Sequence, residues 1–236
     1  MNSSNVEQLR GLECLQVVCC GLPGEKWRAN ADPVADQLAL SRLIDPLKTA
    51  TAKEFILIST IDVYGNRRGD EATNPKPWDV YGQHRKIMEL FVGGRWPNAR
   101  IIRLPAIYGA GLRKNVLFDL LHEHRLDHVN PLSRFQWFSL ARLRAIVDAP
   151  GPPLLNLATE PVQVSELLER FFPQLRVGGL DPPANYDVRS RHCIGDYYQN
   201  RDEVLSELRD FISNYRVGQS EVPDLRGTDA EQPAIA

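Results

Sequence analysis

Residues 53–90 read KEFILISTIDVYGNRRGDEATNPKPWDVYGQHRKIMEL, and this stretch decides the fold. It opens with a short apolar run, Phe55–Ile58, made mostly of β-branched and aromatic side chains. Such a run predicts a buried strand of a parallel sheet. Ser59 and Thr60 follow it directly, so the strand delivers two hydroxyl groups at its carboxyl end.

A helix is predicted to begin after Asp79, whose carboxylate can cap the first turn. Tyr81 and Arg85 are four positions apart in this helix, which is about one turn, so the phenol and the guanidinium share a face. With Thr60 at the tip of the preceding strand, they form a set suited to proton transfer. The alternative is that Thr60 is an ordinary strand-end hydroxyl and Tyr81 a half-buried aromatic residue.

The stretch resembles the extended branch of the short-chain dehydrogenase/reductase superfamily, the NAD(P)-dependent sugar-nucleotide epimerases and dehydratases. Residues 60–65, Thr-Ile-Asp-Val-Tyr-Gly, match its Ser/Thr-x-x-x-Tyr-Gly pattern. Residues 81–85 match its Tyr-x-x-x-Lys pattern, except that arginine replaces the lysine. Lys86 comes one position late, which is about 100° further round the helix, so we expect it to point away from Tyr81.

The resemblance implies a role for each of these side chains. Tyr81 is the acid/base toward a substrate hydroxyl or carbonyl, and Thr60 holds the reacting oxygen, with Ser59 as the neighbouring candidate. The family's lysine also binds the nicotinamide ribose. Arg85 can supply positive charge and donors to the tyrosine and the cofactor, but it stays protonated and therefore cannot join a proton relay.

A second buried strand is predicted at 15–20, closed by Gly21-Leu22-Pro23-Gly24 and followed by a helix at 33–49. By the resemblance, the end of this strand lies over the cofactor, which makes Gly21 and Leu22 candidate cofactor-binding residues. A dinucleotide-binding fold also opens with a Gly-x-x-Gly-x-x-Gly turn, and the sequence contains no such turn. Three explanations stay open: a shortened start, a partner that supplies the missing half, or a protein that no longer binds a dinucleotide.

The next buried strand is predicted at 99–105 and is followed by Ala-Ile-Tyr-Gly-Ala-Gly at 106–111. This string is similar to the family's Arg-x-x-x-x-Tyr-Gly-x-Gly stretch, in which the proline backbone approaches the nicotinamide and the chain enters the substrate lobe. The resemblance therefore makes Pro105 and Ile107 candidate cofactor-binding residues. Taken alone, the string would be an ordinary Pro/Gly turn. A strand at 154–158 and helices at 165–172 and 202–215 complete the predicted fold.

Two segments, 108–138 and 178–200, are expected to form a small substrate lobe. The first contains two cations and an amide at a helix start, which can form an anion-binding lip for the diphosphate of a nucleotide sugar, or simply a solvated surface. It also contains a glutamine expected to point toward the ligand. The second is a polar and aromatic stretch that can line a sugar or base pocket or cover an apolar patch. The candidate substrate-binding residues are Arg113, Lys114, Asn115, Gln136, Tyr186 and Arg189.

Composition limits the class of protein. The chain has 236 residues, of which 43% are hydrophobic and 25% charged, and its formal charge is −2. These values are ordinary for a soluble domain and give no field for nucleic acid or membranes. No apolar stretch approaches about 18 residues and no signal-peptide pattern opens the sequence, so we expect a cytoplasmic protein. The four cysteines lack zinc spacing, which suggests thiols in a reducing compartment, and no metal site is expected.

Taken together, these patterns predict an α/β protein: a Rossmann-like parallel sheet with helices on both faces in residues 1–216, and a disordered tail at 217–236. The function implied by the resemblance is NAD(P)-dependent epimerase, dehydratase or reductase chemistry on a nucleotide-sugar-like small molecule, in a chain that could form a homodimer. NAD and NADP are not distinguished. Two alternatives remain: a catalytically impaired or non-catalytic ligand-binding relative, and a subunit that needs a partner to bind the dinucleotide.

Overall fold

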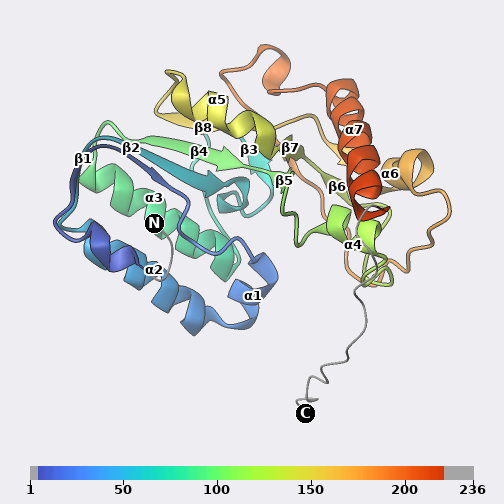
Figure 1. Ribbon diagram of the computed structural model, residues 1–236, viewed down its shortest axis with the longest axis horizontal. Coiled ribbons are helices and arrows are strands. Elements are labelled where there is room, and N and C mark those ends of the chain that lie inside the picture. The colour runs from blue at the N-terminus through green and yellow to red at the C-terminus, as the bar shows by residue number, and fades with distance from the viewer. Residues whose placement is uncertain (1–4, 221–236) are drawn as a thin grey trace.

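The main sheet has four parallel strands in the order β1, β2, β4, β8 (Figure 1). The computed structural model describes residues 5–220. The four strands are Glu13–Cys19, Thr51–Thr60, Arg100–Leu104 and Leu154–Asn156. Because the strands are parallel, their carboxyl ends lie along one edge of the sheet, where ligands bind in open α/β folds. The predicted α/β class with a parallel sheet is confirmed.

Helices cover both faces of this sheet, as predicted. α2 (Pro33–Leu47) and α3 (Val80–Arg95) lie on one side, and α5 (Leu143–Asp148) lies on the other (Figure 1). Alternate β2 residues serve the two faces. Phe55 joins the buried cluster with α2 and α3, whereas Ile56 joins the cluster with α5.

The start of α3 is held close to the end of β2. Asp79 Oδ1 accepts from the Gly82 backbone N–H (2.8 Å), which is the predicted helix cap. A Cβ atom on Gly82 would stand 2.5 Å from the Asp62 carbonyl oxygen, so only glycine permits this approach. A short helix that the sequence did not predict, α1 (Lys26–Ala31), packs against α3 in the same region.

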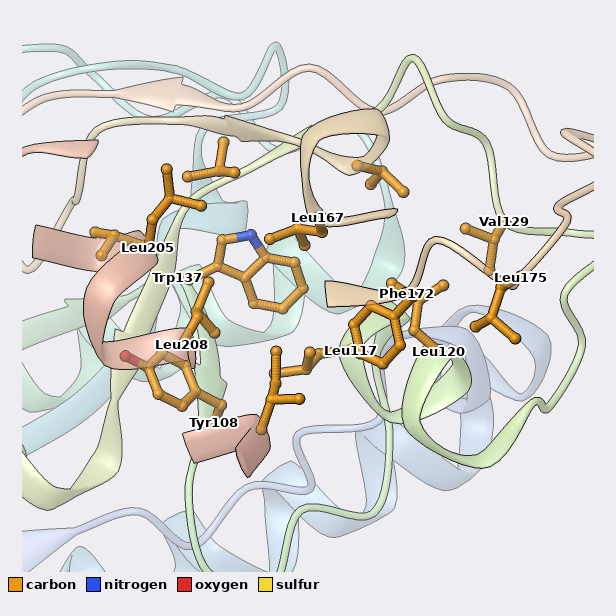
Figure 2. Packing of buried hydrophobic residues seen from close by; sticks show 14 residues of the cluster. Tyr108, Leu117, Leu120, Val129, Trp137, Leu167, Phe172, Leu175, Leu205 and Leu208 are labelled. Carbon is orange, nitrogen blue, oxygen red and sulfur yellow. The ribbon is translucent and has the colours of Figure 1, made fainter. Parts of the chain in front are cut away.

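A second hydrophobic core is built around Trp137 and lies beside the sheet domain. Figure 2 shows side chains from distant parts of the chain pointing toward one another around the Trp137 indole. The core takes residues from α4 (Val116–His122), α6 (Val164–Phe171) and α7 (Arg201–Ser220). It therefore includes two helices, α6 and α7, outside the predicted lobe segments.

Short elements complete the fold. There are three two-stranded pairs, β3 with β10, β5 with β7 and β6 with β9. Their bounds are Arg68–Gly69, Asp187–Val188, Ala106–Tyr108, Trp137–Ser139, Arg134–Phe135 and Val162–Gln163. Single 3₁₀ turns occur at Val6–Leu9, Ile61–Val63, Leu140–Arg142 and Ile194–Asp196.

The predicted tail needs one correction. α7 continues to Ser220, so residues 217–220 are helical, and the remainder of the predicted tail, 221–236, lies outside the described residues. Within residues 5–220, no helix combines the length and apolar character required to span a bilayer.

Candidate functional site

Tyr81 lies in the first turn of α3, against the carboxyl end of β2. Its backbone N–H donates to Asn30 Oδ1 (3.0 Å), and Thr60 lies close enough to its hydroxyl to lower the pKa of the phenol. Tyr81 and Thr60 are each 8% exposed. The structure thus brings the phenol and the strand-end hydroxyl together.

Asp62 connects this pair to three further side chains. Thr60 Oγ1 donates to Asp62 Oδ2 (3.2 Å), and the Tyr186 hydroxyl donates to Asp62 Oδ1 (2.7 Å). The Lys26 ammonium lies 2.5 Å from the same Asp62 oxygen and 3.0 Å from Asp79 Oδ2. Lys26 therefore joins the end of β2 to the residue that caps α3.

The electrostatic surroundings keep Tyr81 protonated in this state. Burial raises the pKa of the phenol most strongly, and the Asp62 carboxylate raises it further. Arg85, Lys26 and the nearby Thr60 hydroxyl act in the opposite direction, and the net pKa lies above its usual range. The phenol is therefore arranged to donate a proton.

Arg85 lies against the Tyr81 ring, but its donors are engaged elsewhere. Its Nη1 donates to Asp36 Oδ2 (2.5 Å), and its Nη2 donates to the Pro23 carbonyl oxygen. His84 Nδ1 is 2.7 Å from the same Asp36 oxygen. Arg85 is 4% exposed. It therefore contributes positive charge to Tyr81 while its hydrogen bonds hold α2, α3 and the loop after β1 together.

The neighbouring Lys86 is directed to a different partner, as its helical position predicts. Its ammonium lies 3.4 Å from Glu89 Oε2. The Ser59 hydroxyl donates to Glu89 Oε1 (2.7 Å), and Arg103 pairs with the same carboxylate (2.7 Å). Ser59 is therefore part of a buried ion-pair network rather than of the group around Tyr81.

Lys114 reaches the loop that follows β1. A Cβ on Gly24 would stand 3.0 Å from the Lys114 ammonium, so the ammonium lies against bare backbone. Burial lowers the pKa of Lys114; Glu25 opposes this effect, and repulsion from Arg85 adds to it. Two cations therefore lie near one another at the carboxyl end of β1, an arrangement that would favour an anion between them.

Two other predicted substrate-binding residues have their polar groups fully occupied by the protein. Gln136 is 1% exposed; its Nε2 donates to the carbonyls of Thr159 (2.5 Å) and Val188 (2.7 Å), and its Oε1 accepts from the Val188 N–H (2.9 Å). Asn115 caps α4 through Oδ1 and donates from Nδ2 to the Ile107 carbonyl (2.8 Å). Both residues join segments of the lobe, and their ligand roles stay predictions.

Arg189 is engaged in ion pairs of its own. It pairs with Asp196 (2.9 Å) and Asp187 (3.7 Å) at an open hollow of about 320 Å³.

The remaining predicted residues lie in different surroundings. Arg113 is exposed and Pro105 is buried. Leu22 packs against the α2–α3 core, and the Leu43 side chain approaches Gly21.

Sequence reasoning missed Lys26, Asp62 and Arg67. The Arg67 guanidinium lies over the rings of both Trp78 (5.5 Å) and Tyr186 (5.0 Å), so it holds Tyr186 in place. Asp62 lies inside the matched residues 60–65, and this adjacency to Thr60 was the available signal. No comparable signal pointed to Lys26, because it precedes Asp62 by 36 positions and lies in a short helix without a regular spacing of apolar residues.

No histidine or cysteine cluster competes with this site. Among residues 5–220, no three His, Cys, Asp or Glu side chains are grouped as a metal site would require. His122 contacts the Tyr215 hydroxyl (2.8 Å), and His124 contacts Asp119 (2.8 Å). All four cysteines are free thiols, and burial raises the pKa of Cys19 to about 11, which makes it unreactive.

Comparison with known proteins gives matches at the level of structure. No protein-family profile and no curated protein matches the sequence. MoeE5, solved with UDP-glucuronic acid and NAD, is 21% identical over 92% of this chain and 83% of its own, with a TM-score of 0.61. WbmG of Bordetella bronchiseptica, solved with NAD, is 14% identical over 86% and 73%, with a TM-score of 0.63. L-threonine dehydrogenase of Phytophthora infestans is 14% identical over 91% and 82%, with a TM-score of 0.66.

At these identities the likeness concerns the fold alone. The predicted resemblance holds at that level: the chain has the Rossmann-like fold seen in MoeE5 and WbmG, two proteins that were solved with NAD.

Proposed function

We propose that the protein is an NAD(P)-dependent oxidoreductase of the epimerase/dehydratase type, with Tyr81 as its acid/base residue. The single observation that carries the proposal is the buried Tyr81 phenol beside the Thr60 hydroxyl at the carboxyl edge of a parallel sheet. The solved neighbours MoeE5 and WbmG, which bind NAD, support the cofactor class.

The residues present fit the anionic part of such a cofactor at the loop after β1. Lys114 and the bare backbone of Gly24 would hold a phosphate or ribose oxygen there. Ser59 and Arg85 fit less well, because Glu89, Asp36 and the Pro23 carbonyl already engage their polar groups. When bound, a nicotinamide would supply or accept the hydride.

The residues of this chain would manage the accompanying proton. When substrate binds, the Thr60 O–H would turn from Asp62 to the substrate carbonyl oxygen beside Tyr81, and Tyr81 would give that oxygen its phenolic proton as the carbonyl carbon is reduced. The raised pKa of Tyr81 suits this direction, because it keeps the donor protonated at neutral pH. In the reverse direction, the positive charges of Arg85 and Lys26 would stabilise the phenolate that accepts a proton.

A nucleotide sugar is the proposed substrate class. MoeE5 has been solved with UDP-glucose and with UDP-glucuronic acid, which supports this choice. L-threonine dehydrogenase shares the same fold, so a small hydroxy-acid substrate belongs in the test.

A ligand-binding relative without turnover is the second candidate. It is favoured by the engagement of Arg85 with Asp36 and Pro23, which commits both terminal nitrogens of the guanidinium to the protein and not to a nicotinamide ribose. A subunit that relies on a partner for the dinucleotide is favoured by the described sheet, because no strand pairs with the outer edge of β1 within residues 5–220.

The test is a titration of the full chain with NADH and NADPH, followed by fluorescence, and then an absorbance assay with UDP-glucose, UDP-glucuronic acid and threonine. Saturable binding with substrate-dependent NADH formation or consumption supports an enzyme. Binding without turnover supports the ligand-binding candidate. No binding of either dinucleotide up to millimolar concentration would reject the oxidoreductase proposal for this chain acting alone.

A further inference from the structure

Lys26 is partly buried, although lysine side chains usually lie exposed on the surface. It comes from α1, yet its ammonium lies between two carboxylates, Asp62 after β2 and Asp79 at the start of α3. Its side chain is 29% exposed, and those of Asp62 and Asp79 are 15% and 18% exposed. The ammonium also lies 3.4 Å from the Tyr186 hydroxyl. This is a half-buried cluster with a single cation in direct contact with two anions.

Without Lys26, the group around Tyr81 would carry unbalanced negative charge. Asp62 accepts hydrogen bonds from Thr60 and Tyr186, which are neutral donors and leave its charge uncompensated. Burying an ionised carboxylate in that condition is costly. The negative field of Asp62 also acts directly on the Tyr81 phenol and opposes its ionisation.

Arg85 does not fill this role, although it is the nearer match by sequence pattern. Its guanidinium faces the Tyr81 ring and is bonded to Asp36, so its charge already serves a buried carboxylate on α2. The hydrogen-bond partners of its guanidinium in the described structure are Asp36 and Pro23, and not Asp62. Lys26 is the only cation among residues 5–220 with an ion pair to Asp62.

We propose that Lys26 is a positioning residue for Tyr81: by neutralising Asp62 and joining it to Asp79, it holds the Thr60–Asp62 hydrogen-bond chain beside the phenol and keeps the phenol able to ionise. The proposal deepens the proposed function, on which it rests, since it assigns to α1 the cationic role that position 85 cannot fill. No proton passes through Lys26 in this scheme. Its effect on Tyr81 has two parts: its charge acts directly on the phenol, and its ion pair holds the Asp62 carboxylate in place.

The charged groups that act most strongly on Tyr81 come from three elements. Asp62 comes from the 3₁₀ turn after β2, Arg85 from α3 and Lys26 from α1, and the neutral Thr60 lies beside the phenol. Asp62 opposes ionisation of the phenol, and the two cations favour it. Loss of Lys26 should therefore disfavour the phenolate by removing a cation, and it should also release the Asp62 carboxylate from its position.

The test is a fluorine NMR titration of protein labelled with fluorotyrosine, without any ligand, with Tyr81→Phe used to assign the signal. Lys26→Met should raise the midpoint of Tyr81 by about one pH unit or more. Asp62→Asn should lower it. In the Asp62→Asn background, Lys26→Met should have a smaller effect, because the direct charge effect remains and only the part that acts through Asp62 is lost. Lys48→Met removes an exposed partner of Asp45 and should leave the Tyr81 midpoint unchanged.

Two outcomes would overturn the proposal: an unchanged Tyr81 midpoint in Lys26→Met, or an equal shift with and without Asp62. If Lys26→Met does not fold, as judged by circular dichroism, Lys26→Gln keeps a donor for Asp62 without the charge and gives the same comparison. The titration needs neither cofactor nor turnover. A failure of NADH binding would thus reject the proposed function while leaving the role of Lys26 separately measurable.

Discussion

The guanidinium carbon of Arg85 lies 3.9 Å from the centroid of the Tyr81 ring, one helical turn away along α3. The cation therefore stacks on the face of the phenol instead of pointing at its hydroxyl. This geometry lets Arg85 favour the phenolate electrostatically and stabilise the ring position, while its N–H groups bind Asp36 and the Pro23 carbonyl. The positive charge of Arg85 thus acts on Tyr81, while its hydrogen bonds are made to Asp36 and Pro23.

Replacing Tyr81 by phenylalanine tests the acid/base role. The change removes the proton donor beside Thr60 but keeps the ring that packs on Arg85. We expect kcat of any NAD(P)-linked reaction found for the protein to fall by about 100-fold or more, with the Kd for NADH within about two-fold of wild type. Steady-state kinetics and NADH titration measure the two quantities. An equal loss of both would mean that the hydroxyl is structural.

Arg85→Met tests whether the guanidinium is a structural partner of Asp36. It would leave a buried carboxylate with only His84 as a partner, so we expect the free energy of unfolding to fall by about 3 kcal/mol. Arg85→Lys keeps the charge opposite Asp36 and should lose less. Urea unfolding gives both values, and Lys48→Met, at an exposed pair, should cost no more than about 1 kcal/mol. Equal losses in Arg85→Met and Lys48→Met would contradict this view.

Gly82→Ala tests the close approach of α3 to the end of β2. The new Cβ would collide with the Asp62 carbonyl oxygen at 2.5 Å, so we expect lower stability and a displaced Tyr81. Gly93→Ala, in the same helix, is the matched control: nothing lies within 4 Å of its Cβ position. There alanine should raise the free energy of unfolding by about 0.5–1 kcal/mol. Denaturant unfolding distinguishes the two, and a gain in Gly82→Ala would disprove the contact.

Alkaline pH should destabilise the protein through its buried phenols. Burial and Asp62 raise the pKa of Tyr186 well above its usual range. The folded state therefore holds this proton more tightly than the unfolded chain. Stability is unaffected by this group below the unfolded pKa of about 10 and falls as pH rises beyond it, by up to about 1.4 kcal/mol per pH unit. Tyr186→Phe should flatten the pH dependence of unfolding above about pH 10; an unchanged slope would show that Tyr186 titrates normally.

The sheet and the helices α2 and α3 could be predicted, because apolar runs and the helical spacing of apolar residues indicate which side chains are buried. The predicted strand at 15–20 corresponds to β1, Glu13–Cys19, and the predicted helix at 33–49 to α2, Pro33–Leu47. α1 could not be predicted in the same way. It has six residues, no side-chain cap at Glu25 and one buried residue, Ala29, so its position depends on tertiary contacts.

The site was less predictable than the fold, because the residues next to a polar side chain in the sequence do not show which distant residue it will contact. Thr60 and Tyr81 could be predicted as neighbours because both belong to sequence patterns with a fixed spacing. Ser59 is adjacent to Thr60, yet strand alternation turns its hydroxyl toward Glu89 on α3. Gln136 has the same local sequence whether its amide meets a ligand or, as here, two backbone carbonyls. Lys26 shows the converse case, a functional candidate visible only once α1 is placed beside Asp62.

The contribution of α7 to the core around Trp137 determines when the lobe can fold during synthesis on the ribosome. Leu205, Leu208 and Ile212 close a cluster whose other members, such as Leu117 and Trp137, are synthesised much earlier. The four-stranded sheet is complete once β8 has emerged, and it can begin to form then. The lobe must wait for α7, and until that helix arrives its apolar surface is a target for chaperones and for aggregation.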